Sequence, residues 1–125
     1  MSLVIKGEFD VYDESVIDLS ASGGTHATFT RIDYDVKGAD EITLFIINGV
    51  DEVNGIENGN STNLDVNIYG DVGLGYTTVP ITTGNLGANS SDMIFCLTGF
   101  YKLKVEFVNL DSSATIASYR LVVKK

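Results

Sequence analysis

Two runs of alternating apolar and polar residues near the C-terminus constrain the fold of this chain more than any other feature. The first run alternates apolar with charged residues: Tyr101, Leu103, Val105 and Phe107 against Lys102, Lys104 and Glu106. The second run continues the pattern from Thr115 to Val123 and includes Arg120. A spacing of two places one set of side chains on a core and the other in solvent, as in a β-strand. Because only residues 109–113 separate the runs, we predict that they pair as a β-hairpin.

The same alternation recurs along the chain and predicts an all-β fold. Strands are expected at residues 3–11, 16–19, 28–36, 42–47, 64–68 and 76–82. The segment 42–47 is apolar on both faces, as expected of a central strand that is covered on both sides. No stretch has the 3.6-residue spacing of a helix. About seven to nine strands at this spacing predict an antiparallel β-sandwich, or a fold like a jelly roll.

Length and composition indicate a globular protein with a single domain, residues 1–125. The 125 residues are 44% hydrophobic and 20% charged, and a chain of this size buries roughly two thirds of its extended-chain surface. The N-terminus lacks the basic and apolar segments of a signal peptide, and no apolar run reaches about 18 residues. We therefore expect a soluble protein, made in the cytoplasm, with no signal peptide and no membrane span.

The net charge of −9 lies wholly in the first half of the chain. Residues 1–63 hold 12 acidic and 3 basic side chains, whereas residues 64–125 hold 5 of each. Nucleic acid is not an expected partner, because binding it requires clustered Lys and Arg. The predicted hairpin is locally basic through Lys102, Lys104 and Arg120, which permits contact with an acidic surface of another copy or another protein. The alternative is that these charges are solvated and only keep the protein soluble.

The longest predicted loop, residues 48–63, is rich in Gly, Asn, Asp and Glu, and residues 83–92 form a second one. Loops of this length are usually tied to function or assembly. Val53 and Ile56 are poorly placed for solvent, so we predict that they anchor contacts between chains or to a lattice. The carboxylates and amides of the same loop provide an alternative, a calcium site, although their spacing is not that of an EF-hand.

The sequence offers no motif for catalysis, and we predict a protein that is not an enzyme and has no metal or cofactor. His26 is the only histidine, and no Gly-x-Ser-x-Gly motif marks a nucleophile. Cys96 is the only cysteine and lies in the apolar run 93–97, where a free thiol is expected to be buried. The glycine-rich segment 70–75 is expected to form a corner between strands, because no helix follows it to hold a phosphate.

Two segments carry a resemblance to a known class of protein: residues 34–44, Tyr-Asp-Val-Lys-Gly-Ala-Asp-Glu-Ile-Thr-Leu, and residues 104–111, Lys-Val-Glu-Phe-Val-Asn-Leu-Asp. In these segments, in size and in strand pattern, the chain resembles the small auxiliary or decoration proteins on the heads of tailed bacteriophages. The resemblance implies a structural protein of the virion whose copies dock on a capsid lattice. The implied partners are other copies, as a trimer or another symmetric oligomer, and the major capsid protein. The alternative function is a carbohydrate- or ligand-binding β-sandwich module that uses calcium.

Overall fold

The computed structural model describes residues 9–19, 28–48, 50–51, 56–57, 63–87, 92–111 and 114–124. These residues form ten strands: β1 (Phe9–Leu19), β2 (Thr28–Asp35), β3 (Glu41–Asn48), β4 (Val50–Asp51), β5 (Ile56–Glu57), β6 (Leu64–Asp71), β7 (Thr82–Leu86), β8 (Asp92–Leu97), β9 (Lys102–Asn109) and β10 (Thr115–Lys124). None of the described residues forms a helix that is long and apolar enough to cross a membrane.

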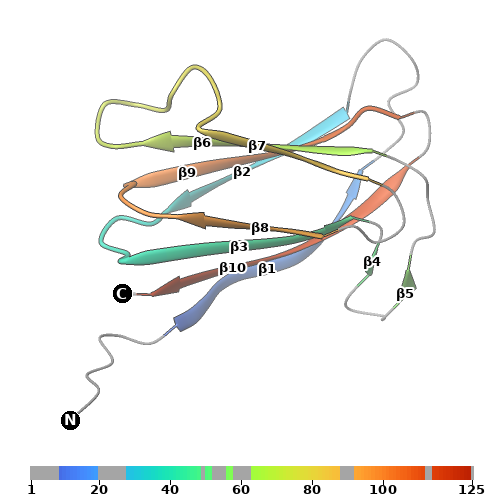
Figure 1. The fold of residues 1–125 in the computed structure, drawn as a ribbon, viewed down its shortest axis with the longest axis horizontal. Helices are drawn as coiled ribbons and strands as arrows, with labels where there is room; N and C mark the ends of the chain where they lie inside the picture. The colour runs from blue at the N-terminus through green and yellow to red at the C-terminus, as the bar shows by residue number, and fades with distance from the viewer. Residues whose placement is uncertain are drawn as a thin grey trace.

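Eight of these strands form two four-stranded antiparallel sheets that pack face to face (Figure 1). The first sheet has the order β1-β10-β3-β8, and the second sheet has the order β2-β9-β6-β7. Among the eight, only β6 and β7 are consecutive strands that pair within one sheet, so every other connection crosses between the layers. This strand order is that of a jelly roll. The predicted all-β antiparallel sandwich is therefore confirmed.

The predicted hairpin between the two C-terminal runs is wrong. β9 lies between β2 and β6 in the second sheet, whereas β10 lies between β1 and β3 in the first sheet (Figure 1). Alternation identifies a strand and its buried face but carries no information about which strand pairs with it. The inward side chains of β9 and β10 instead meet across the core, where the ring centroids of Phe107 and Tyr119 are 5.7 Å apart.

The core lies between the two sheets and consists of the inward-facing residues of both. The first sheet contributes Leu19, Ile42, Leu44, Ile46, Phe95, Leu97, Ala117, Tyr119, Leu121 and Val123, and the second contributes Tyr34, Leu64, Val66, Ile68, Leu86, Leu103, Val105 and Phe107. The segment 42–47 is an internal strand as predicted, but it is fully buried on one face only. Phe45 and Ile47 point away from the core and remain half-buried.

The two segments 3–11 and 16–19 were predicted as separate strands, and residues from both belong to the single strand β1. The pairing of β1 with β10 shifts between Val11 and Asp13, which makes Tyr12 the extra residue of a β-bulge. Before the bulge, Val11 pairs with the outward-facing Val122; after it, Asp13 pairs with the core residue Leu121. The bulge therefore turns the carboxylate of Asp13 toward the space between the sheets.

The predictions for residues 76–92 are also wrong in part. Tyr76 makes only an isolated bridge to Asp71, and the strand β7 occupies residues 82–86, where a loop was expected. The sequence of β7 does not show the alternation of a strand, because β7 is an edge strand with one fully buried side chain, Leu86. The predicted glycine corner is confirmed, since Gly73 and Gly75 have φ angles of +106° and +98°.

Replacing Gly70 by Ala should destabilise the fold because a ring occupies the space beside this glycine. A Cβ atom at position 70 would lie 2.5 Å from two carbons of the Phe100 ring. Overpacking of this kind typically costs about 1 to 3 kcal/mol. Gly84→Ala is the matched comparison, because its nearest neighbour is the flexible end of Met93, and a ring carbon of Phe95 lies farther away, at 3.0 Å. Urea denaturation should show the larger loss for Gly70→Ala, and equal losses would contradict this packing.

Candidate interaction surfaces

The basic residues proposed as one contact edge lie on opposite sides of the molecule. Lys102 and Lys104 belong to β9 and point outward from the second sheet, whereas Arg120 belongs to β10 and points outward from the first sheet. They were grouped because β9 and β10 were expected to pair as neighbours, and this pairing does not occur. The structure therefore does not gather the three into one basic edge, and their contact with another protein stays a prediction.

Two of these cations also have a side-chain partner within the chain. The Arg120 Nε atom lies 2.8 Å from a carboxylate oxygen of Glu14 on the neighbouring strand. The Lys104 ammonium lies 4.6 Å from the ring centroid of Tyr69 and 4.9 Å from that of Tyr76. Such cation–π contacts hold a charge in place and weaken its availability to another protein. Lys102 pairs in register with Asp35 on one side and Asp71 on the other.

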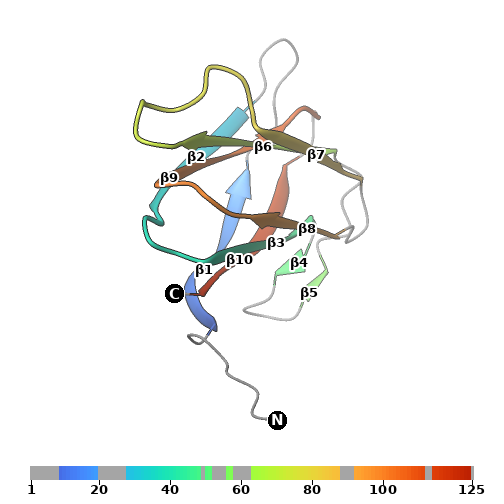
Figure 2. The ribbon, with the colours of Figure 1, turned by 60° about the vertical axis from the view of Figure 1, so that its left-hand side comes forward.

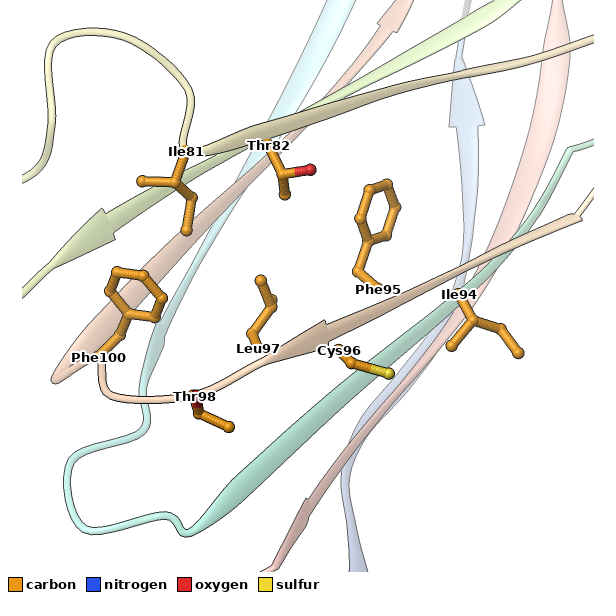
Figure 3. A pocket seen from close by; sticks show the side chains of 8 residues that line it. All are labelled: Ile81, Thr82, Ile94, Phe95, Cys96, Leu97, Thr98 and Phe100. Atoms are coloured by element: carbon orange, nitrogen blue, oxygen red, sulfur yellow. The ribbon is translucent and has the colours of Figure 1, made fainter.

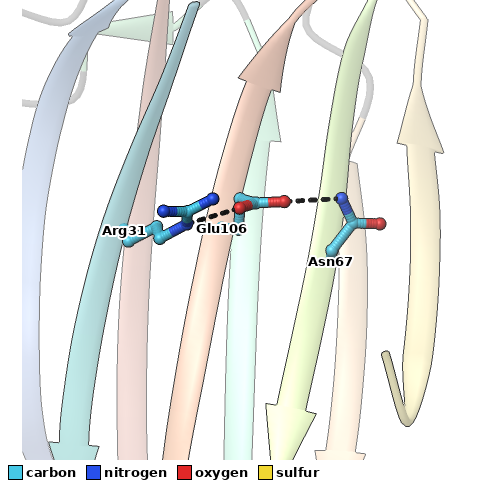
Figure 4. A network of polar contacts seen from close by, with 3 residues as sticks. All are labelled: Arg31, Asn67 and Glu106. Atoms are coloured by element: carbon cyan, nitrogen blue, oxygen red, sulfur yellow. Dashed lines mark hydrogen bonds and ion pairs between the residues drawn. The ribbon is translucent and has the colours of Figure 1, made fainter. Parts of the chain in front are cut away.

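The outer face of the second sheet is mostly polar, with the apolar pair Phe29 and Val108 at one end. At its centre, Glu106 is almost fully buried and accepts two hydrogen bonds, from Arg31 Nε at 2.6 Å and from Asn67 Nδ2 at 3.1 Å (Figure 4). The Arg31 guanidinium also lies 4.2 Å from the ring centroid of Phe29. This arrangement satisfies a buried carboxylate on a solvent-facing surface and indicates a structural role for the ion pair.

The outer face of the first sheet carries more apolar side chains than that of the second, interspersed with charged residues such as Glu14, Glu41 and Lys124. The outward residues of its four strands include Val11, Val16, Phe45, Ile47, Ile94 and Val122, together with Cys96. We call this set the apolar face. Ile94 is 61% exposed, although it lies in a strand beside Phe45. Cys96 is exposed as well, so its predicted burial is wrong. The apolar run 93–97 sends alternate residues to the core and to this face.

A tyrosine cluster joins the two sheets along the edge formed by β1 and β2. The inward carboxylate of Asp13 accepts hydrogen bonds from Tyr119 Oη at 2.6 Å and from Tyr34 Oη at 3.1 Å. The Tyr12 hydroxyl donates to the backbone oxygen of Asp35 at 2.7 Å, and its ring meets that of Tyr34 edge to face, with centroids 6.0 Å apart. Burial, reinforced by the hydrogen bond to Asp13, raises the pKa of Tyr119 to about 12. Burial and the neighbouring Tyr119 hydroxyl raise the pKa of Tyr34.

The opposite edge, between β7 and β8, is open. A hollow of about 500 Å³ separates these strands; its lining consists of Ile81, Thr82, Ile94, Phe95, Cys96, Leu97, Thr98 and Phe100. Figure 3 shows the side chains of Ile81, Thr82, Phe95, Leu97 and Phe100 gathered around this space, while Ile94 and Cys96 point away from it. Figure 2 shows β7 and β8 as the facing edge strands of the two layers. We call this space the edge hollow.

The other predicted contact residues lie outside what the structure describes. Val53 falls in the undescribed range 52–55, and Ile56 is assigned to β5, which pairs with β4, but its side chain is undescribed. Most of the possible calcium loop and His26 are undescribed too. Among the described residues, no three His, Cys, Asp or Glu side chains gather in a way that could hold a metal ion.

Sequence reasoning missed the apolar face and the edge hollow as candidate contact surfaces. The signal for the apolar face was present in the segment 42–47, whose outward residues are as apolar as its inward ones. We interpreted this pattern as cover on both sides by the same chain. No local pattern in the sequence indicates the edge hollow, because Ile81 precedes β7 and Phe95 lies in β8, and only the topology brings these two segments together.

Comparisons with known proteins support the fold. No protein-family model matches the chain, and no curated protein matches it in sequence. In three dimensions it is similar to the crystal structure of the Yersinia pseudotuberculosis-derived mitogen (YPM), with a TM-score of 0.56 and 13% sequence identity. The similarity covers 95% of this chain and 88% of that chain. At this identity, the likeness shows a shared β-sandwich fold alone.

Proposed function

We propose that this protein is a non-enzymatic assembly protein, and that its apolar face packs against the same face of a second copy. The observation that supports the proposal is the contrast between the two sheets. An antiparallel sheet that faces water usually alternates apolar residues inward with polar residues outward. The second sheet follows this rule except at one end, where Phe29 and Val108 face outward, whereas the first sheet presents Phe45, Ile94 and Val122 outward among its charged residues. An exposed apolar patch of this kind is typical of a protein–protein contact.

The size of the apolar face suits a contact between two copies. Strands lie about 4.8 Å apart and residues about 3.4 Å apart along a strand, so the whole outer face of the first sheet, its charged residues included, outlines on the order of 500 Å². The relief of the side chains raises the accessible area above this flat value. A standard stable interface buries about 800 Å² on each partner. The face is therefore large enough for a modest dimer interface and too small for an obligate one.

Charge also favours a second copy as the occupant. The ion pair between Glu14 and Arg120 places one negative and one positive charge side by side within the apolar face. A two-fold axis through this region brings each charge near its opposite on the other copy, as an isologous contact permits. Two copies of this acidic chain, each with a net charge of −9, would thus contact each other where the charges of Glu14 and Arg120 balance.

The more specific form of the proposal is a decoration protein on a phage capsid. It rests on the resemblance of residues 34–44 and 104–111 to the auxiliary head proteins, and jelly rolls are common among viral capsid domains. In this form, copies associate as a symmetric oligomer, such as a trimer, and dock on the major capsid protein of the virion. Repetition by symmetry strengthens an individually weak contact. Native mass spectrometry should then give a single stoichiometry.

A charge placed on the apolar face should prevent association. Ile94→Lys introduces an ammonium group into a surface that becomes desolvated on contact, and we expect dimerisation to weaken about 100-fold or more. Thr83→Lys is the matched control, because Thr83 is exposed on β7, the edge strand of the other sheet. Sedimentation velocity of the two variants and the wild-type protein measures the effect. Equal association of all three would contradict the proposal.

A second candidate, the ligand-binding module, has one observation in its favour. A shallow hollow of about 460 Å³ at one end of the second sheet has Asp33, Asp35, Tyr76 and Lys102 in its lining. Burial and a hydrogen bond to Asp33 raise the pKa of Tyr76 to about 12, so its hydroxyl remains a donor at neutral pH. Carboxylates beside an aromatic ring suit a sugar. A glycan array with and without calcium separates this function from assembly.

A further inference from the structure

The strand β8 forms one edge of the first sheet. In the order β1-β10-β3-β8 it pairs with β3 on one side, and none of the described residues pairs with it on the other side. Figure 2 shows that β7 faces β8 from the other layer and so does not lie beside it within the sheet. An unpaired edge presents a row of backbone N–H and C=O groups that can pair with a strand of another chain.

The three other edge strands carry features that discourage such pairing, whereas β8 does not. Strand β1 has the bulge at Tyr12 and several acidic side chains. Strand β2 includes Arg31, Asp33 and Asp35, and β7 has only five residues, one of them Gly84. Charges, bulges and short or glycine-containing edges all oppose the addition of a strand. The six residues of β8 are apolar except the first, and their register with β3 is continuous.

We propose that β8 pairs antiparallel with β8 of a second copy across a two-fold axis. The two first sheets then join into one sheet of eight strands. Identical strands match in length, and a two-fold axis perpendicular to the sheet keeps both outer faces on the same side. Charge also favours this partner, because the single charge of the strand, Asp92, lies at its first residue. An antiparallel pair places the two Asp92 carboxylates at opposite ends, so these like charges of two acidic copies stay apart.

The alternation of core and outward residues along β8 restricts the register of this pair. Residues that lie opposite each other must point to the same side of the joined sheet, so the register changes only in steps of two. With Phe95 on the axis, Ile94 lies opposite Cys96 of the second copy, and the charged Asp92 lies opposite the polar Thr98. An axis at Ile94 would instead place Asp92 opposite Cys96. We therefore expect Phe95 on the axis.

The inference rests on the proposed assembly function and shares two residues with it, because Ile94 and Cys96 also belong to the apolar face. The edge contact uses the backbone of β8, whereas the face contact uses its outward side chains. Edge pairing places two apolar faces side by side, and the joined surface outlines on the order of 1,000 Å². A standard stable interface buries about 800 Å² on each partner. Pairing through β8 thus enlarges the surface through which the faces associate.

Disulfide trapping between two single-cysteine proteins tests this register. One protein is the wild type, whose only cysteine is the exposed Cys96; the other carries Ile94→Cys and Cys96→Ser, and a tag distinguishes it. Opposite residues of antiparallel strands have Cα atoms about 4.5 to 5.5 Å apart, within the range of a disulfide. In each pair of identical proteins the two cysteines are offset by two residues. After mild oxidation, we therefore expect mixed dimers to exceed either like dimer about tenfold.

Thr43→Cys with Cys96→Ser is the matched control. Thr43 lies beside Cys96 on β3 and points to the same outer face. In the edge-paired dimer it lies two strand spacings, about 10 Å, from β8 of the second copy, beyond the roughly 7 Å between Cα atoms that a disulfide allows. Packing of the outer faces would bring both positions toward the second copy. Mixed trapping as fast with Thr43→Cys as with Ile94→Cys would therefore overturn edge pairing and leave the face contact standing.

Val122→Lys in both proteins separates the two contacts further. Val122 belongs to the apolar face but lies on β10, two strands from the β8 edge. The lysine should weaken association through the face, and mixed trapping through β8 should persist. Trapping that persists supports edge pairing even if the apolar face proves inert. Trapping that disappears with Val122→Lys, or that never exceeds the like dimers in the wild-type background, overturns edge pairing.

Discussion

Replacing Asp13 by Ala should lower the free energy of unfolding by about 3 kcal/mol. The carboxylate of Asp13 is the acceptor for the hydroxyls of Tyr34 and Tyr119, both of which are buried. Removing it leaves two buried donors without this partner, and each such donor costs about 1 to 3 kcal/mol. Chemical denaturation followed by tyrosine fluorescence measures the loss. Asp13→Asn retains an oxygen acceptor and should recover much of the stability.

The same cluster predicts that stability falls at alkaline pH. The pKa of Tyr119 is about 12 in the folded protein, whereas a tyrosine in an unfolded chain titrates near pH 10. The unfolded chain therefore loses its proton first, and the stabilisation is complete below about pH 10 and declines as pH rises through about 12. A shift of this size corresponds to about 2 to 3 kcal/mol. Asp13→Asn removes a charge that raises the pKa of Tyr119, so the variant should lose less stability than the wild-type protein between pH 10 and pH 12. An equal loss of stability in both proteins would contradict the role of Asp13.

Phe107→Ala should be the most destabilising single substitution considered, with a loss of about 3 to 5 kcal/mol. The Phe107 side chain has no exposed surface and contacts the ring of Tyr119 from the opposite sheet. Truncation removes apolar burial and leaves a cavity in the middle of the sandwich. Phe29→Ala deletes the same group at a position that is 52% exposed on the neighbouring strand β2, and its loss should stay below about 1 kcal/mol.

Thermal or urea denaturation of these two variants tests whether β9 directs Phe107 into the core. A loss for Phe107→Ala no larger than that for Phe29→Ala would mean that β9 turns its other face inward. In that case Lys104 and Glu106 would face the core, and the assignment of both sheets would be wrong.

The positions of the strands could be predicted from the sequence more readily than the pairing between strands. Alternation at residues 103–107 and 115–123 correctly identified two strands and their buried faces, because the period of two is a property of one strand. Tyr101, predicted to share the buried face, instead precedes β9 and is exposed. Pairing depends on contacts between distant segments, so the same pattern gave the wrong partner for β9. The strand β7 was missed because Thr83, Gly84 and Asn85 have the composition of a loop. It is a strand because β6 offers it an edge.

The candidate contact surfaces were harder to predict than the fold. Lys102, Lys104 and Arg120 were predicted as contact residues from their charge alone. Whether charged residues form one surface patch depends on the fold, which the sequence pattern did not give. These residues lie in different sheets. Within the chain, Arg120 pairs with Glu14, and Lys104 contacts the rings of Tyr69 and Tyr76. The outward apolar residues of β3 were visible in the sequence, but their significance depended on finding that the second sheet packs on the other side of that strand.

Assembly through the apolar face is the central claim, and light scattering after size exclusion tests it most directly. The protein should elute as a species heavier than the 13.4 kDa monomer, with a mass that rises with concentration. Because apolar burial drives the contact, added salt should leave this mass unchanged or increase it. A monomer at every concentration would contradict the claim. An oligomer that dissociates as salt is added would contradict it as well, because charge and not apolar burial would then hold the copies together.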